Sequence, residues 1–517
     1  MPKVTIDGIS VEVPDGTNLV RAAEMADVEI PHYCYHPGLS IAGNCRMCLV
    51  DIRAMSAKQP NPLPKLQIAC NTVVQDGMVV DVNSEKVRQA RRSVLEFLLI
   101  NHPIDCPICD QAGECKLQEY YMDYGRYHSR FALEAKNHKH KVLPIGPDVM
   151  LDQERCILCT RCIRFLDEVS KSHELTIVER GDHNEITPAH GATVDNPYAS
   201  NIVDICPVGA LTSREFRFQA RVWYLDTARS ICAGCATGCN IEVHYRDETI
   251  FRLKPRHNDE VNGYWMCDAG RRTHKHNRDT NRLQSSLARE GGQFLDLDSD
   301  AVAELAARSL SGAKFPAVIA SAGMSLEEGF LLGEILDALG GGERIVISPA
   351  VSSIPDDGKL ISSDRFPNRR GLLALGFREA QKPAAAIDAA LIVRCDPVTQ
   401  DGSWASTLES LRATVVVAER VEETTGYADH VLGVSSHFES DGTFMNRQGR
   451  IQRFEAAVPP PGRTVPGWRA LAELLAALGG PRYDSVDAVT EMVLKKLTER
   501  EGLGREWLGT GGRPVAA

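Results

Sequence analysis

A short stretch near residue 100 carries four side chains that can bind metal. His102, Cys106, Cys109 and Cys115 follow one another at a His-x3-Cys-x2-Cys-x5-Cys spacing. Three thiolates and an imidazole can hold either a zinc ion or an iron–sulfur cluster, and this stretch alone leaves both open. His102 could instead be a histidine that only favours the dipole at a helix C-terminus. Its spacing from Cys106 favours the ligand role.

Further cysteines stand in sets of four on both sides of this stretch. The chain has 16 cysteines, and all but one precede residue 268. We number the sets in chain order, so that the opening stretch is the second. The first set is Cys34, Cys45, Cys48 and Cys70; the third is Cys156, Cys159, Cys162 and Cys206; and the fourth is Cys232, Cys235, Cys239 and Cys267. These 12 cysteines, the three cysteines of the opening stretch and His102 supply 16 ligands, enough for four four-coordinate clusters. Cys395 is left over, and we expect it to be a buried, inert thiol.

The first set follows a hairpin signal and a short helix. Alternating residues around Asp7-Gly8 predict two strands, and a helix is expected over 18–26. This order is similar to a plant-type [2Fe–2S] ferredoxin, although the first gap is ten residues rather than about four. A zinc ribbon is the alternative. A proline-rich insert over 59–64 lengthens the loop before Cys70.

The third set has the ferredoxin run Cys-x2-Cys-x2-Cys, with Cys206-Pro207 standing 44 positions after Cys162. No second complete run lies nearby, so these four cysteines are expected to hold one [4Fe–4S] cluster between them. Structural zinc is the alternative, but zinc prefers paired Cys-x2-Cys knuckles.

The fourth set is spaced Cys-x2-Cys-x3-Cys-x27-Cys, and the residues inside it alternate like small strands.

The elements that position these residues can be placed from the apolar pattern. An amphipathic helix over 84–101, capped by Ser84 and ended by Pro103, delivers His102 to its loop. Beyond residue 283 the pattern alternates strand and helix, which indicates an α/β domain with a parallel sheet. Strands are expected over 316–320 and 414–418, and helices over 324–339 and 468–478.

Composition excludes several classes of function. The 517 residues are 43% hydrophobic and 25% charged, as in an ordinary globular protein of several domains. A net charge of −11 argues against a nucleic-acid partner. No apolar run approaches the roughly 18 residues of a membrane helix, and the first residues show no signal region. We therefore expect a cytosolic chain without direct membrane insertion, which meets a membrane only through partners.

The four sets, in this order, resemble the large iron–sulfur subunits of respiratory complex I. The resemblance covers roughly residues 1–282 and includes Arg-Cys-Ile-Leu-Cys-Thr-Arg-Cys-Ile-Arg-Phe over 155–165 and Asn-Ile-Val-Asp-Ile-Cys-Pro-Val-Gly-Ala-Leu over 201–211. It implies a [2Fe–2S] cluster in the first set and a [4Fe–4S] cluster in each of the other three. Bacterial members of the family keep the fourth set and mitochondrial members lack it. The fourth set is also similar to the first domain of molybdopterin oxidoreductases.

The implied fold class is a series of α+β ferredoxin-like cluster modules followed by an α/β molybdopterin-oxidoreductase-like domain. We expect six parts: a β-grasp [2Fe–2S] domain over 1–83, a His(Cys)3 [4Fe–4S] module over 84–146, a ferredoxin-like [4Fe–4S] domain over 147–222, a molybdopterin-oxidoreductase-type [4Fe–4S] domain over 223–282, an α/β remnant without pterin over 283–500, and a flexible tail over 501–517.

Two departures argue against a bound molybdopterin. Molybdenum formate dehydrogenases and nitrate reductases usually carry lysine two positions after the last cysteine of this cluster, where this chain has Ala269. No cysteine after Cys267 lies in a molybdenum-ligand motif, although the segment 439–450 resembles the one that follows their pterin-binding sheet.

A G-x-G-x-x-G dinucleotide-binding fingerprint is also missing from the sequence. We expect no flavin, NADH site, quinone site or catalytic residue on this chain.

The resemblance implies an electron-transferring subunit of a translocating NADH:quinone oxidoreductase. Electrons would pass from a flavin- and NADH-binding subunit through the first three clusters to the quinone-side iron–sulfur subunits of the peripheral arm. The fourth cluster would be structural, and the chain would lie on the cytoplasmic side of the cell membrane. The alternatives are an iron–sulfur subunit of an NAD-linked formate dehydrogenase or hydrogenase, and a multi-zinc scaffold without redox chemistry.

Overall fold

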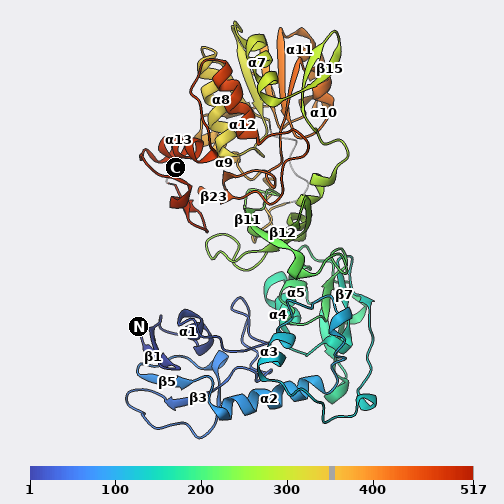
Figure 1. Ribbon diagram of the computed structural model, residues 1–517, viewed down its shortest axis with the longest axis vertical. Coiled ribbons are helices and arrows are strands. Elements are labelled where there is room, and N and C mark those ends of the chain that lie inside the picture. The colour runs from blue at the N-terminus through green and yellow to red at the C-terminus, as the bar shows by residue number, and fades with distance from the viewer. Residues whose placement is uncertain (348–354, 516–517) are drawn as a thin grey trace. The chain divides into compact units, whose positions relative to one another are not determined.

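The computed structural model describes residues 1–347 and 355–515 (Figure 1). The chain divides into two compact units, Met1–Tyr224 and Leu225–Ala517, which are described separately. Among the described residues, no helix has the length and apolar character needed to span a bilayer.

The first unit begins with a five-stranded mixed sheet. Its order is β2-β1-β5-β3-β4, with β1 parallel to β5 and the other pairs antiparallel. The strands are β1 (Lys3–Ile6), β2 (Ile9–Glu12), β3 (Leu49–Ala54), β4 (Gln67–Ile68) and β5 (Met78–Asp81). Helix α1 (Leu19–Met25) packs its buried side on the same core, and Asn18 caps it by accepting the Arg21 N–H at 3.0 Å. The predicted hairpin, helix and ferredoxin-like fold are confirmed.

Helix α2 (Glu85–Leu99) leads from this sheet to His102. Ser84 caps it as predicted, because its hydroxyl accepts the Val87 N–H. Helix α3 (Lys116–Tyr124) packs against α2. The buried Arg91 ties these helices to β3 by donating to the Tyr124 hydroxyl at 3.1 Å and to the Leu49 carbonyl at 3.4 Å.

The rest of the first unit surrounds the third cysteine set with short elements. A three-stranded antiparallel sheet has the order β10-β7-β6, and β8 and β9 form a hairpin. The elements are β6 (Leu143–Pro144), β7 (Val149–Leu151), α4 (Arg161–Phe165), β8 (Leu175–Val178), β9 (Glu185–Pro188), α5 (Asn201–Asp204) and β10 (Leu211–Ser213).

The second unit is organised around an eight-stranded sheet of order β15-β14-β21-β20-β19-β16-β17-β18. The strands from β21 to β18 run parallel, and β14 and β15 add an antiparallel edge. The strands are β14 (Ser286–Glu290), β15 (Gln293–Leu297), β16 (Pro316–Ala320), β17 (Glu343–Val346), β18 (Arg378–Glu379), β19 (Ala389–Val393), β20 (Ala413–Ala418) and β21 (His430–Gly433). The predicted parallel α/β domain is confirmed.

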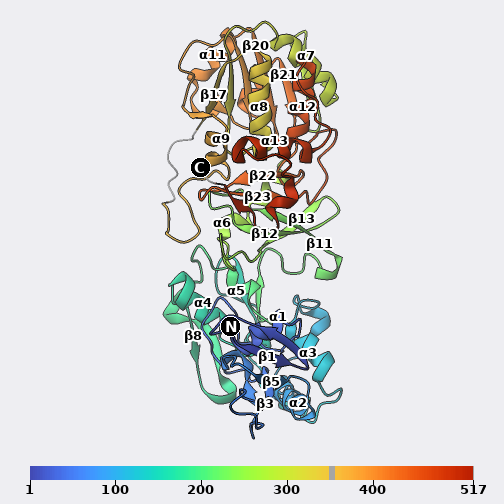
Figure 2. The same ribbon diagram turned by 90° about the vertical axis from the view of Figure 1, so that its left-hand side faces the viewer.

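Helices cover both faces of this sheet (Figures 1 and 2). Along β16, Val318 packs toward α7, α8 and α12, whereas the next residue, Ile319, packs on the face that carries α10 and α11. This alternation is the period of two of a strand buried on both sides. The helices are α7 (Ser299–Leu310), α8 (Leu326–Ala338), α9 (Arg369–Ala374), α10 (Pro397–Gln400), α11 (Ser403–Ser410), α12 (Gly467–Ala477) and α13 (Val486–Thr498).

Two small antiparallel sheets complete the second unit. Their orders are β11-β12-β13 and β22-β23-β24. The elements are β11 (Asp226–Ile231), β12 (Asn240–Arg246), β13 (Thr249–Pro255), the short helix α6 (Asp268–Arg271), β22 (Gly442–Met445), β23 (Arg450–Phe454) and β24 (Arg513–Pro514).

The C-terminal segment differs from the flexible tail that its glycines led us to expect over 501–517. Leu508, in a 3-10 helix over Arg505–Leu508, is buried, and β24 pairs with β23 through Arg450 and Pro514. A buried side chain and a strand partner fix residues that composition alone would leave frayed. Residues 516–517 lie outside the described part.

Candidate iron–sulfur sites

The structure brings the four cysteines of the first set together. The Sγ atoms of Cys48 and Cys70 lie 3.5 Å apart. A hydrogen bond from Cys45 lowers the pKa of the Cys34 thiol to about 5. Cys48 directly precedes β3, and Cys70 lies in the 3-10 helix Ala69–Asn71, so the sheet fixes both. Four converging sulfur atoms match the donor set of a two-iron cluster.

The second set is arranged around a histidine that lacks a partner. His102 follows α2, and its Nδ1 atom is buried with no hydrogen-bond partner among the described residues. Burial lowers the pKa of this imidazole to about 4, so it is neutral at physiological pH, as a metal ligand must be. Burial, together with the nearby Cys109 and Cys106, raises the pKa of Cys115 to about 11. A neutral imidazole and three neighbouring thiols fit a His(Cys)3 site.

The third set lines an apolar cavity. All four of its cysteines face this space, together with aliphatic side chains from β7, β9 and β10: Leu151, Ile186 and Leu211. Burial raises the pKa values of Cys156 and Cys206 to about 12 each. Such thiols ionise only when a cation lies beside them, which the iron of a cluster supplies.

The fourth set lies in the second unit, at the ends of three short elements. Cys232 follows β11, Cys239 precedes β12, and Cys267 is the N-cap of α6. The Gly270 N–H donates to Cys267 Sγ at 3.4 Å. A Cβ atom on Gly270 would stand 3.0 Å from Cys232 Sγ and 3.5 Å from Cys267 Sγ, so a side chain there would crowd both ligands.

Residues from the far end of the chain hold the loop between Cys235 and Cys239. The backbone N–H of Arg447 donates to the Ala236 carbonyl at 2.7 Å. The side-chain amide of Asn446 donates to the Thr237 carbonyl at 3.2 Å, and that of Gln452 donates to the Gly238 carbonyl at 2.9 Å. Three successive carbonyls of this loop are therefore bound by the β22–β23 segment.

One apolar core joins the first three sets. It contains Cys34, Cys115 and Cys159, one from each set, together with Tyr33 and Tyr120. Gly209, three residues after Cys206, packs so closely on the second set that a Cβ atom there would lie 2.3 Å from Cys109 Sγ. The fourth set packs in a separate core of the second unit, with Ile241 and Phe438 among its members.

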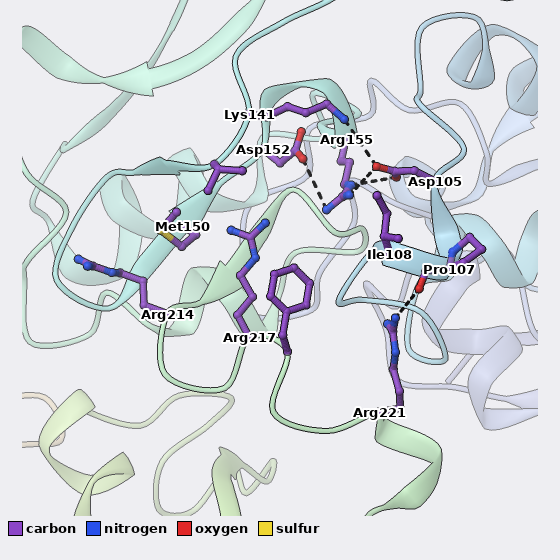
Figure 3. A pocket seen from close by; sticks show the side chains of 12 residues that line it. Asp105, Pro107, Ile108, Lys141, Met150, Asp152, Arg155, Arg214, Arg217 and Arg221 are labelled. Carbon is purple, nitrogen blue, oxygen red and sulfur yellow. Dashed lines mark hydrogen bonds and ion pairs between the residues drawn. The ribbon is translucent and has the colours of Figure 1, made fainter.

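A cluster of charged side chains links the second and third sets (Figure 3). Arg155, which precedes Cys156, donates to both carboxylate oxygens of Asp105, at 3.1 and 2.6 Å, and lies 3.5 Å from Asp152. The Nζ atom of Lys141 lies 3.5 Å from a carboxylate oxygen of the same Asp105. Asp105 and Arg155 each directly precede a cysteine in the sequence, but nothing in their spacing indicated that they pair.

Cys395 is buried, as predicted. Its thiol lies against the Ile319 carbonyl at 3.5 Å, and burial raises its pKa. Among residues 1–347 and 355–515, no three His, Cys, Asp or Glu side chains form a group suited to a single metal ion.

At the carboxyl ends of β19 and β20, the kind of place where doubly wound sheets usually bind ligands, side chains of the chain itself pair with one another. Arg394 follows β19 and donates to Glu328 at 2.9 Å, and it also pairs with Glu419 at the end of β20. Gly467 packs so tightly here that a Cβ atom would lie 1.8 Å from Glu328 Oε1. These side chains leave a poor fit for a pterin.

Five stretches of the chain match known families, and each cysteine set falls inside one of the first four. The descriptions are "2Fe-2S iron-sulfur cluster binding domain" over 2–85, "NADH-ubiquinone oxidoreductase-G iron-sulfur binding region" over 91–130, "NADH-quinone oxidoreductase subunit 3, ferredoxin-like domain" over 146–212, "Molybdopterin oxidoreductase Fe4S4 domain" over 225–278, and "Molybdopterin oxidoreductase" over 368–477.

Two relatives that match longer parts of the chain are also named as subunits of NADH-quinone or NADH-ubiquinone oxidoreductases. A subunit of the NADH-quinone oxidoreductase of Rickettsia conorii is 39% identical over 342 residues, which are 66% of this chain and 49% of that protein. Over this length, the chain is a homologue of that oxidoreductase subunit. The mitochondrial NADH-ubiquinone oxidoreductase 78 kDa subunit of Candida albicans is 43% identical over 296 residues, which are 56% of this chain and 39% of that protein. The chain thus spans about half the length, or less, of these curated relatives.

A solved structure of an NAD+-reducing [NiFe]-hydrogenase in the H2-reduced state is also similar to part of this chain. The TM-score is 0.37 at 30% identity, covering 43% of this chain and 91% of that chain. A similarity this low supports no argument about function. The order of families matches the expected series of ferredoxin-like modules followed by a molybdopterin-oxidoreductase-like domain.

Proposed function

We propose that this chain is the electron-transferring iron–sulfur subunit of an NADH:quinone oxidoreductase. The observation that carries the proposal is the single core of the first unit, in which cysteines of the first three sets lie together. Neighbouring clusters are what an electron pathway requires. A chain of separate zinc-stabilised modules would have no need to share one core among its metal sites.

The sites would hold one [2Fe–2S] cluster and three [4Fe–4S] clusters. The ligands are Cys34, Cys45, Cys48 and Cys70 for the first; His102, Cys106, Cys109 and Cys115 for the second; Cys156, Cys159, Cys162 and Cys206 for the third; and Cys232, Cys235, Cys239 and Cys267 for the fourth. The clusters supply one-electron redox chemistry, and the chain supplies ligands, burial and hydrogen bonds that tune the potentials.

The partners follow from the chemistry that the chain lacks. Its sequence contains no dinucleotide fingerprint, so NADH oxidation belongs to a flavin-bearing partner, and quinone reduction belongs to iron–sulfur subunits on the other side. The complex would be attached to the cytoplasmic face of the cell membrane through those partners. The fourth cluster, which packs in the core of the second unit, would be structural.

We also propose that the second unit holds no molybdopterin. Support comes from Arg394, Glu328 and Glu419, which pair with one another at the carboxyl edge of the sheet. Ala269 stands where molybdenum enzymes of the related type usually carry lysine. No electron step is therefore assigned to a pterin.

Metal analysis and a reconstituted reaction test the proposal. Anaerobically purified chain should contain about 14 iron atoms, from one two-iron and three four-iron clusters, with negligible zinc or molybdenum. NADH should reduce these clusters only when the flavin-bearing partner is present. Stoichiometric zinc with little sulfide, or NADH oxidation by the pure flavin-free chain, would overturn the proposal.

A further inference from the structure

Two arginines of the third cysteine motif reach across to the first set. Arg161 and Arg164 stand on either side of Cys162 in α4. Arg161 donates to the Tyr35 carbonyl, and Arg164 donates to the Cys34 carbonyl at 2.5 Å. Both contacts join segments about 130 residues apart in the sequence, at the loop that carries the first cysteine of the first set.

Arg164 also bonds its own cysteine set. The same terminal nitrogen that donates to Cys34 lies 3.3 Å from the Cys159 carbonyl, and Nε donates to the Thr160 hydroxyl at 3.2 Å. One guanidinium therefore connects the main chains of two cysteines that belong to different sets. The planar fork of arginine, with five N–H donors in a fixed geometry, permits this arrangement, whereas the single ammonium of lysine does not reproduce it.

Arg161 secures the other side of the third set. It donates to the carbonyl of Ile205, which directly precedes Cys206, at 3.1 Å. Further contacts close the same junction: the Ser40 N–H donates to Glu168 at 2.8 Å, and the Asn44 amide donates to the Leu158 carbonyl at 3.3 Å. The loop of the first set is thus bound to the third motif at several points, with the two arginines at its centre.

We propose that Arg161 and Arg164 are positioning residues that hold the first cluster site against the third and raise the reduction potentials of both. The inference rests on the proposed function, since it takes the two sets to hold clusters. With both clusters bound, one electron would pass from the reduced [2Fe–2S] cluster to the oxidised [4Fe–4S] cluster, and no bond would form or break. Positive charge beside the ligands favours the reduced, more negative state of each cluster. A fixed spacing matters because electron tunnelling slows steeply with distance.

The test compares R164Q and R164K with R180Q in the full, cluster-loaded chain. Arg180 lies exposed in the β8–β9 hairpin of the same unit and serves as the matched control. The measurements are the midpoint potentials of the two clusters, the magnetic coupling between their reduced forms by EPR, and the rate at which the third cluster is reduced by NADH through the flavin-bearing partner.

R164Q is expected to lower both potentials, weaken the coupling and slow the transfer roughly 10-fold, as is typical when a partner of metal ligands is removed. R164K should keep the potentials near those of the unchanged chain, because it keeps the charge, but should lose coupling and rate. R180Q should change none of these quantities. A purely structural role would affect iron content and thermal stability without shifting the potentials of the remaining clusters.

An R164Q chain with full iron content and unaltered potentials, coupling and rate would overturn the proposal. If R164Q does not retain its iron, R164K decides, and unchanged coupling and rate in that variant would overturn it equally. If the unchanged chain itself shows no EPR signals of two-iron and four-iron clusters, the proposed function fails before the arginines are tested.

Discussion

His102 is the one residue of the second set that would bring no negative charge to a cluster bound there. Its imidazole is neutral when buried, since its pKa is lowered to about 4, and its Nδ1 has no other partner among the described residues. A neutral ligand would leave a cluster at this site less negative than four thiolates would, so the cluster would accept an electron more readily.

Replacing His102 with cysteine should therefore lower the midpoint potential of the second cluster, by on the order of 100 mV. The measurement is an EPR-monitored redox titration of the full chain. His183→Cys, at a side chain that is 69% exposed, is the control and should leave the potentials unchanged. An H102C cluster that titrates with the original potential would show that His102 is not a ligand.

His437 gives the second unit a sensitivity to acid. Its ring packs at a tilt against that of Phe438, with centroids 3.9 Å apart, and burial together with the charge of Arg394 lowers its pKa to about 3. Between pH 6.5 and about 3 the unfolded chain binds a proton at this residue and the native chain does not. The free energy of unfolding therefore falls as pH falls through that window. Above pH 6.5 both states are deprotonated at His437, so this residue adds no pH dependence there.

His437→Phe should remove this part of the pH dependence. Urea unfolding at pH 7 and pH 5, followed by tryptophan fluorescence, measures it, because four of the five tryptophans lie in the second unit. The variant should lose less stability between the two pH values than the unchanged chain. The exposed His276→Phe is the control. An equal loss in H437F and the unchanged chain would contradict this account.

At the scale of elements, α12 begins where α8 and β19 already meet. Gly467 is its first residue, and it lies against the Glu328–Arg394 ion pair. Glu328 has two roles there, because it also closes the capping box of α8 with Ser325. The start of one helix thus depends on the side chain that caps another.

Gly467→Ala should destabilise the second unit by about 1–3 kcal/mol, because a methyl group would overlap the Glu328 carboxylate and force it away from Arg394. Gly402→Ala is a matched control before α11, since a Cβ atom there meets nothing within 4 Å. Urea unfolding monitored by tryptophan fluorescence gives both values. Equal stability of the two variants would contradict the packing argument.

Elements with strong periodicity could be predicted from the sequence. The strand at 316–320 is found as Pro316–Ala320, and the helix expected over 84–101 is found as Glu85–Leu99. The spacing of the cysteines also predicted which of them lie near one another. Neither pattern could predict the contacts of Arg161 and Arg164, because spacing along the chain does not specify a partner about 130 residues away. The pairing of β24 was missed for the same reason.

At the scale of the molecule, the cysteine sets are divided between the two units. Three sets share the core of the first unit, and the fourth lies in the second. If the first three sets carry the electrons and the fourth is structural, as proposed, then metal binding at the fourth set would supply folding energy to the second unit. Loss of a ligand should therefore have different effects in the two units.

Cys159→Ser should abolish most electron flux from NADH to quinone in the assembled complex. Cys239→Ser should instead reduce the amount of assembled complex while leaving turnover per complex near normal. Turnover is normalised to flavin content, so that lost assembly is not mistaken for lost transfer. Fully assembled C239S complexes with most of their flux gone would place the fourth cluster on the pathway.

The bonds between the Cys235–Cys239 loop and the β22–β23 segment bear on the timing of synthesis. A ribosome exposes every ligand of the first three sets once residue 206 has emerged, and N-terminal domains generally fold first. The fourth loop must wait for Asn446, Arg447 and Gln452 before its carbonyls are bound. During that interval four cysteines stand exposed on an unfinished domain. Iron–sulfur delivery to this chain should therefore occur in two episodes, the first possible once residue 206 has emerged and the second only after residue 452 has emerged.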